Sequence, residues 1–208
     1  MIKQEVDWSL YLVADRRAAA GRSLVEVVRA AIAGGTSVVQ LRDKEATTRE
    51  MIALGRTLRE VTRECRVPLI VNDRVDVALA VNADGVHVGR EDMPAGVARA
   101  LIGDGRLLGV STETVDEARA AERNGADYLG VGDVFGTASK PDAGTPVGPR
   151  RIEEVVRAVA IPVVGIGGIT PKNARRVIEA GAAGIAVISA VVAADDPEGA
   201  ARSLRELL

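Results

Sequence analysis

Polar side chains alternate at the end of one short apolar run in this sequence. Gln40, Arg42 and Lys44 are separated by Leu41 and Asp43. Alternate side chains of a strand share one face, so the first three point the same way. Guanidinium and ammonium groups bind anions through charge-assisted hydrogen bonds. In isolation the triplet fits a solvated loop equally well, and its place in the fold must decide between a loop and an anion site.

Two aspartates follow the next two apolar runs. Asn72 and Asp73 close one run, and Asp92 stands three residues after Gly89, which ends the following run. A carboxylate pair without thiol or histidine partners suits a hard cation such as Mg²⁺ held together with phosphate oxygens. The alternative for Asp73 is the N-cap of a following helix.

Glycine-rich junctions mark a second anion site. The stretch 162–170 contains Gly165, Gly167 and Gly168, and the apolar run 184–190 ends near Ile188 and Ser189. Glycine lets a backbone approach a ligand closely, and the N–H groups at the start of the next helix favour an anion. Backbone groups of Gly168, Ile188 and Ser189 are therefore expected to hold a phosphate.

Further hydroxyl and ammonium groups follow two other apolar runs. Ser111 ends one, and a loop after the next carries Thr137, Ser139 and Lys140. The single histidine, His87, lies inside an apolar run, which favours a structural role over a catalytic one.

The elements that must position these residues are short apolar runs alternating with helical patterns. That alternation predicts an α/β fold, either a closed barrel or a doubly wound sheet. No Gly-x-Gly-x-x-Gly motif follows the first run, which favours a single-domain (β/α)₈ TIM barrel over residues 1–208. In such a barrel the polar residues after successive strands converge on one mouth. The expected strands lie at 10–15, 37–42, 68–71, 85–89, 107–111, 128–131, 162–170 and 184–190.

The amino-acid composition limits the classes of partner that the protein is expected to bind. Lys+Arg 27 against Asp+Glu 29 gives a formal charge of -2, and aromatic residues make up 2% of the chain. Neither a basic field nor stacking surfaces are present for nucleic acid, and no long apolar run indicates a membrane partner. One cysteine and one histidine exclude a disulfide framework and a three-histidine metal site. The sequence thus indicates a cytoplasmic protein with small-molecule partners, and it leaves a homo-oligomer open.

Taken together, these residues resemble the thiamine-phosphate synthase family from residue 10 to residue 207. Several separated motifs carry the resemblance, including Gln40-Leu41-Arg42-Asp43-Lys44, Asn72-Asp73, His87-Val88-Gly89 with Asp92, Gly109-Val110-Ser111-Thr112, Val134-Phe135, Thr137 to Lys140, Gly165-Ile166-Gly167-Gly168-Ile169 and Ile188-Ser189.

The resemblance implies a (β/α)₈ barrel transferase. It would join hydroxymethylpyrimidine diphosphate to hydroxyethylthiazole phosphate and release pyrophosphate, with Mg²⁺ as cofactor. The implied metal ligands are Asp73 and Asp92, and the implied catalytic groups are Arg42, Lys44, Ser111 and Lys140. The implied substrate contacts are Gln40, Arg42, Lys44, Asn72, Ser111 and Lys140 for the pyrimidine diphosphate and Thr137, Ser139, Gly168, Ile188 and Ser189 for the thiazole phosphate.

One loop departs from the family pattern. Proline is usual where Asp133 and Gly136 stand, and threonine is usual at Ser139. A related thiazole tautomerase has a catalytic histidine at the position of Asp133, which this chain lacks. The remaining alternatives are another phosphate-site barrel, such as a sugar-phosphate epimerase, and a non-catalytic binder of phosphate ligands.

Overall fold

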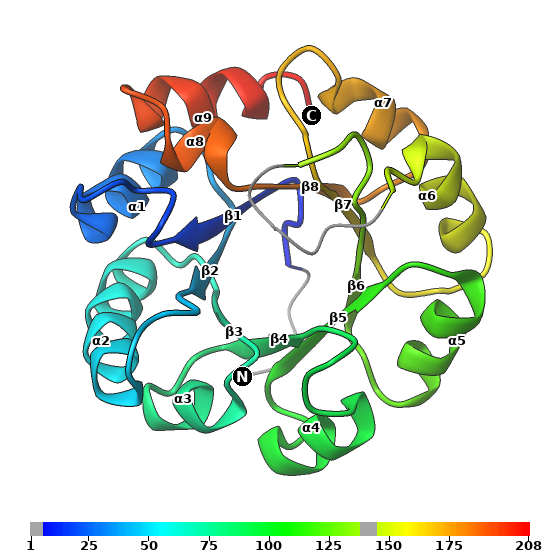
Figure 1. Cartoon of the computed structure of the whole chain (residues 1–208), viewed down its shortest axis with the longest axis horizontal. Coiled ribbons are helices and arrows are strands. Elements are labelled where there is room, and N and C mark those ends of the chain that lie inside the picture. Colours follow the sequence, from blue (N-terminus) through cyan, green and yellow to red (C-terminus); the bar gives the residue numbers. More distant parts are fainter. Residues whose placement is uncertain (1–5, 138–144) are drawn as a thin grey trace.

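Parallel strands close into a barrel in which each strand pairs with the next one along the chain and the last pairs with the first (Figure 1). The computed structural model describes residues 6–137 and 145–208. The expected (β/α)₈ barrel is confirmed. Its strands are β1 (Leu10–Asp15), β2 (Val38–Arg42), β3 (Leu69–Asn72), β4 (Gly85–Val88), β5 (Leu107–Thr112), β6 (Tyr128–Val131), β7 (Val163–Ile166) and β8 (Gly184–Val187).

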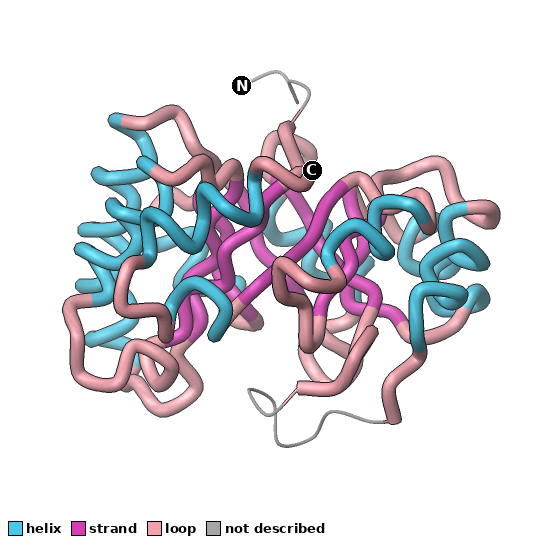
Figure 2. The backbone as a smooth tube through the Cα atoms, turned by 90° about the horizontal axis from the view of Figure 1, so that it is seen from above, coloured by secondary structure: helices cyan, strands magenta, loops and turns pink. Residues whose placement is uncertain are grey.

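Helices form a ring around these strands, which run through the middle of the molecule (Figures 1 and 2). Two begin at capping boxes, in which Thr47 pairs with Glu50 and Thr114 with Glu117, and these satisfy N–H groups that the first helical turn leaves unpaired. The helices are α1 (Leu24–Ala33), α2 (Thr48–Glu64), α3 (Val75–Ala80), α4 (Ala95–Ile102), α5 (Val115–Arg123), α6 (Gly148–Val156), α7 (Ala174–Glu179), α8 (Ser189–Val192) and α9 (Pro197–Arg205).

Two apolar layers hold the barrel together. The larger lies between the strands and the helix ring and includes Leu41, Leu69 and Leu129, all fully buried. The smaller fills the barrel interior around Tyr11 and Tyr128. Trp8 belongs to this inner layer, with its ring centroid 4.3 Å from that of Tyr128. Burial of apolar side chains is the main favourable term in folding. Because such side chains fill the barrel, its interior is a packed core below the mouth rather than a pore.

Element boundaries differ from the sequence expectation at the last two βα units. Strand β7 ends at Ile166, short of the expected end at residue 170, and α7 begins at Ala174, because Asn173 Oδ1 accepts a hydrogen bond from the Thr170 N–H and holds the intervening residues in a turn. Strand β8 ends at Val187, and Ser189 opens the short helix α8. No helix in the described ranges has the length and hydropathy needed to cross a membrane.

Candidate active site

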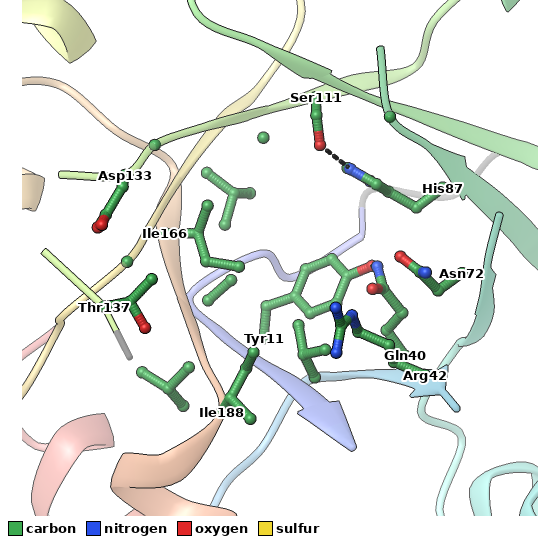
Figure 3. A pocket seen from close by; sticks show the side chains of 18 of the residues that line it. Tyr11, Gln40, Arg42, Asn72, His87, Ser111, Asp133, Thr137, Ile166 and Ile188 are labelled. Atoms are coloured by element: carbon green, nitrogen blue, oxygen red, sulfur yellow. Dashed lines mark hydrogen bonds between the residues drawn. The ribbon is translucent and has the colours of Figure 1, made fainter. Parts of the chain in front are cut away.

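A cavity of about 370 Å³ lies at the carboxyl ends of the strands (Figure 3). All eight strands or the loops after them contribute residues to it, and β1 does so through Tyr11 and Val13 inside the strand. Ser139 and Lys140 fall outside the described residues. Every other residue predicted for the site lines this cavity: Gln40, Arg42, Lys44, Asn72, Asp73, Asp92, Ser111, Thr137, Gly168, Ile188 and Ser189.

The carboxylates of Asp73 and Asp92 meet at one side of the cavity. Asp92 is oriented by the Gly89 N–H, which donates to its Oδ2 at 2.7 Å. Asp73 follows β3 in the left-handed region, with φ of 61°, which aspartate tolerates better than most side chains. Its own N–H donates to the carbonyl oxygen of His87 at 2.8 Å. Backbone groups thus orient the Asp92 carboxylate directly and hold the main chain of Asp73. The helix-cap alternative for Asp73 is wrong, since the N-cap position of α3 belongs to Arg74.

Electrostatics at this pair favour a cation. The pKa of Asp73 is raised to about 6, because burial and the adjacent Asp92 carboxylate both raise it and together outweigh the opposing effect of Lys44. The Lys44 Nζ lies 3.4 Å from Asp73 Oδ2. Two carboxylates this close repel each other when both are charged, so a bound cation would relieve the repulsion. Mg²⁺ is commonly held by one or two carboxylates together with substrate phosphates and water. The pair fits that ion.

No larger metal-binding cluster competes with this pair. Among the described residues, no group of three or more histidine, cysteine, aspartate or glutamate side chains could hold a metal ion. An all-protein cage such as a structural zinc site is therefore absent from the described part of the chain. The fit is to a hard cation whose remaining ligands come from substrate and water.

Arg42 is held by a residue that the sequence did not single out. Its guanidinium forms an ion pair with Asp15, the last residue of β1. Asp15 is 6% exposed and also accepts a hydrogen bond from the Ala18 N–H at 3.2 Å. The pairing follows from strand register, which places Asp15 directly beside Arg42. Asp15 therefore fixes the direction of Arg42. The feature of the sequence that could have indicated this role is an aspartate at the end of the first expected strand.

The glycine-rich junction after β7 packs against the loop after β6. Gly167 and Gly168 both have positive φ, 105° and 61°. A Cβ on Gly168 would overlap the carbonyl oxygen of Gly136, so only glycine allows the two loops to approach this closely. Asn173 Nδ2 donates to the carbonyl oxygen of Gly168 at 3.0 Å and holds the turn. The junction forms one wall of the cavity.

Asp133, where the resembled family usually has proline, stabilises the same loop in another way. Its Oδ1 accepts a hydrogen bond from the Gly136 N–H at 3.0 Å. Gly136 has φ of 91°, which glycine adopts without strain. The Asp133 charge is therefore partly engaged by the loop backbone, and an aspartate turn replaces the stiffness of the prolines.

Buried hydrogen bonds cross the floor of the cavity below these charged groups. Gln40 Nε2 donates to the hydroxyl of Tyr11 at 2.7 Å, and this hydroxyl lies 2.7 Å from that of Tyr128. The Tyr128 hydroxyl is 3.0 Å from His87 Nδ1. His87 Nε2 in turn lies 2.9 Å from Ser111 Oγ (Figure 3). Sequence reasoning missed the two tyrosines as site residues because both lie inside apolar runs. The network joins two of the predicted substrate contacts.

Fold and site together define a class: a (β/α)₈ barrel with a polar cavity at its carboxyl mouth, of the kind that carries an enzyme active site. The sequence profile of the family described as thiamine monophosphate synthase matches residues 10–191. The chain belongs to this family.

Individual relatives are similar in sequence to this chain over nearly its whole length. The thiamine-phosphate synthase of Roseiflexus castenholzii is 58% identical over 94% of this chain and 86% of its own. That of Chloroflexus aurantiacus is also 58% identical, over 98% of this chain and 94% of its own. Among solved structures, thiamine phosphate pyrophosphorylase from Pyrococcus furiosus is similar, with a TM-score of 0.90 and 48% identity over 97% of this chain and 96% of that one. The resemblance read from the separated motifs is thereby confirmed.

Proposed function

We propose that this chain is a thiamine-phosphate synthase that joins 4-amino-2-methyl-5-hydroxymethylpyrimidine diphosphate to 4-methyl-5-(2-phosphooxyethyl)thiazole. The products are thiamine phosphate and pyrophosphate. The observation that carries the proposal is the Asp73 and Asp92 pair beside Lys44 in one cavity with the glycine-rich junction at Gly168. The pair and Lys44 suit a diphosphate with a hard cation, and the junction suits a separate phosphate.

The proposed reaction breaks one bond and forms one. The C–O bond between the pyrimidine methylene and the diphosphate breaks, and its electron pair leaves with pyrophosphate. The thiazole nitrogen then donates its lone pair to the methylene carbon. The electron-rich aminopyrimidine carries the positive charge between these steps, so no protein nucleophile or base is required.

The residues of the chain act mainly by electrostatics and positioning. Arg42, aligned by Asp15, and Lys44 stabilise the negative charge that grows on the leaving diphosphate. When Mg²⁺ is bound, it would be held by Asp73 and Asp92 and would neutralise further charge on that group. Gln40, Asn72 and Ser111 position the pyrimidine diphosphate. Fixing both substrates in one cavity lowers the entropic barrier to their encounter.

The thiazole phosphate occupies the other side of the cavity in this proposal. Backbone groups of Gly168, Ile188 and Ser189 hold its phosphate, and Thr137 contacts it from the loop after β6. Ser139 and Lys140, which lie outside the described residues, are proposed for the thiazole phosphate and the diphosphate respectively. The enzyme is proposed to act as one catalytic domain over residues 1–208, and self-association into a homo-oligomer stays a prediction.

Product formation tests the proposal directly. Purified protein is mixed with both substrates and Mg²⁺, and thiamine phosphate and pyrophosphate are measured with and without a chelator. Equal production of both, abolished by chelator and restored by excess Mg²⁺, is expected. Binding of either substrate without turnover would contradict the proposal and favour the tautomerase or the non-catalytic binder.

A further inference from the structure

A continuous series of hydrogen bonds links Gln40 on β2 to Ser111 on β5 through the barrel floor. It passes through Tyr11, Tyr128 and His87, with successive donor–acceptor distances of 2.7, 2.7, 3.0 and 2.9 Å. Gln40 and the three central residues are at most 9% exposed, whereas Ser111 is exposed toward the cavity. Buried polar groups of this kind are costly unless each is paired, so the proton positions along the series are constrained.

Counting protons assigns a direction to the series. The Gln40 amide donates to the Tyr11 hydroxyl, and either tyrosine hydroxyl could donate to the other. Within the series the buried Tyr11 proton can be accepted only by the Tyr128 oxygen, so pairing every proton requires Tyr11 to donate to Tyr128. Tyr128 then donates its own proton to His87 Nδ1. An imidazole that accepts at Nδ1 and is neutral carries its proton on Nε2, from which it donates to Ser111 Oγ. Burial raises the pKa of both tyrosines above the ordinary value, so they remain donors at neutral pH.

Glycines clear the space that this series occupies. A Cβ on Gly109 would overlap the Tyr128 hydroxyl and the His87 ring. A Cβ on Gly130 would lie 3.1 Å from His87 Cε1, which is tighter than ordinary contact, and 3.5 Å from His87 Nε2. Both glycines lie within strands, where glycine costs stability and commonly marks a close approach. The local sequence is thus arranged around the histidine and tyrosine side chains.

We propose that His87 is a positioning residue which, as its neutral Nε2–H tautomer, makes Ser111 a hydrogen-bond donor toward the cavity, while the same series leaves Gln40 Oε1 as an acceptor. This inference rests on the proposed function for its substrate. A 4-aminopyrimidine matches the pattern, because its amino group donates and its ring nitrogens accept. A 4-oxopyrimidine reverses the pattern, because its oxo group accepts and one ring nitrogen carries a proton. The series therefore selects the amino ring.

The tautomer can be measured without any substrate. His87 is the only histidine of the chain, so ¹⁵N-labelled histidine reports the two ring nitrogens of one residue. An unprotonated Nδ1 and a protonated Nε2 at neutral pH are expected. A protonated Nδ1, whether in the other neutral tautomer or in the imidazolium, would reverse or break the series and overturn the proposal.

Selectivity between two pyrimidine diphosphates provides the second measurement. Wild-type protein should bind the 4-amino compound on the order of 10²-fold more tightly than its 4-oxo analogue, because the reversed groups would leave buried partners unpaired. Equal affinity would overturn the proposal. If neither compound binds while the ¹⁵N spectrum shows the Nε2–H tautomer, the substrate assignment fails and the hydrogen-bond series stands.

Tyr128→Phe removes the donor that fixes the tautomer and keeps the ring. The substitution should weaken binding of the 4-amino compound by about tenfold, the scale of one net hydrogen bond. It should also reduce the preference for the 4-amino over the 4-oxo compound. The KM for thiazole phosphate should stay unchanged. Thr36→Val is the matched control, since it removes another buried hydroxyl in the loop between α1 and β2. If Tyr128 had a purely structural role, Tyr128→Phe would weaken binding of both substrates alike and leave the preference for the 4-amino compound intact.

The conservative variant of the histidine completes the test. In His87→Gln the side-chain amide can still donate to Ser111, whereas His87→Leu has no donor. Binding of the 4-amino compound should be retained better by the glutamine variant than by the leucine variant. Equal loss in two folded variants would contradict a positioning role, and the wild-type ¹⁵N spectrum decides the matter if the leucine variant fails to fold.

Discussion

At the scale of single residues, the Asp73 and Asp92 pair differs from an ordinary salt bridge and is better suited to binding a cation. Lys44 contacts Asp73, yet the pKa of Asp73 remains raised because burial and Asp92 outweigh that one ammonium group. Two adjacent carboxylates with one ammonium partner still repel each other when both are charged. The residual repulsion indicates that a further positive charge belongs there during function.

Asp92→Ala should therefore reduce turnover with Mg²⁺ by about 10²-fold or more, because charge on the leaving diphosphate loses its stabilisation. The fold should persist, since the variant relieves repulsion. Steady-state kinetics over a range of Mg²⁺ concentrations, with far-ultraviolet circular dichroism, measure both effects. Asp104→Ala, at an exposed position in the loop before β5, is the control and should behave as wild type. Normal turnover in Asp92→Ala would remove Asp92 from the site.

At the scale of elements, the short helix α8 depends on a side chain from the other end of the sequence. Four residues are too few for a self-supporting helix. Arg22, in the loop after β1, donates to the carbonyl oxygen of Val192, the last residue of α8, and to that of Ala194 beyond it, the latter at 2.7 Å. A cation at a helix carboxyl end is favourable. Arg22 thereby supports the segment that begins with Ile188 and Ser189.

Arg22→Ala should raise the KM for thiazole phosphate about three- to tenfold, the scale of one charge-assisted hydrogen bond lost behind the phosphate site. The KM for the pyrimidine diphosphate should change little, because its proposed contacts lie on other strands. Steady-state kinetics with each substrate varied in turn give the two values. Arg150→Ala, at an exposed position on α6, serves as the control. An equal rise in both KM values would argue that Arg22 acts on the whole fold.

The segment before β1 is fastened to α9 by another charge pair. Arg205 donates to Asp7 Oδ2 at 2.7 Å, and Ser9 also donates to the Asp7 carboxylate. These contacts lower the pKa of Asp7 to about 2, with the Arg205 hydrogen bond as the largest cause. Because the pKa is depressed in the folded state, the stabilisation is complete above the unfolded value and is lost as pH falls through the folded value.

Asp7→Asn should lower the free energy of unfolding by less than about 1 kcal/mol at neutral pH, since both side chains are more than a third exposed. The difference from wild type should shrink between about pH 4 and pH 2. Urea denaturation across that range measures it, with Asp104→Asn as the control. A difference that stays constant down to the acid end would show that the ionised state of Asp7 is not the source of the stabilisation.

How far the sequence predicts these elements depends on how local their causes are. Thr47 and Glu50 form a capping box within four residues, so the start of α2 is readable from the sequence. The four residues of α8 contain no helical period, and its Arg22 partner lies some 170 residues away. Asp15 likewise acquires its role only when register sets it beside Arg42. Residue types at strand ends were predictable, whereas their orienting partners required the tertiary structure.

At the scale of the whole molecule, the two ends of the barrel have different tasks. The carboxyl end holds the cavity. At the amino end, aspartates that precede β4 and β6 bind the starts of neighbouring strands. Asp84 accepts from the Leu69 N–H at 2.8 Å and pairs with Arg59 at 2.6 Å. Asp127 accepts from the Leu108 N–H at 2.8 Å and pairs with Arg99. Each pair links a strand to a helix of the outer ring. This placement indicates that the two pairs contribute to stability and not to catalysis.

Asp84→Asn should therefore lower the free energy of unfolding by about 2–3 kcal/mol, because the largely buried Arg59 charge loses its carboxylate. The kinetics of the folded variant should match wild type, the reverse of the result expected for Asp92→Ala. Urea denaturation and steady-state kinetics of both variants measure this separation. Glu154→Gln, which removes an exposed carboxylate paired with Arg150, is the matched control and should cost less than about 0.5 kcal/mol. If Asp84→Asn impaired turnover while folded, strain at the amino end would have to reach the cavity, and the two ends could no longer be treated as independent.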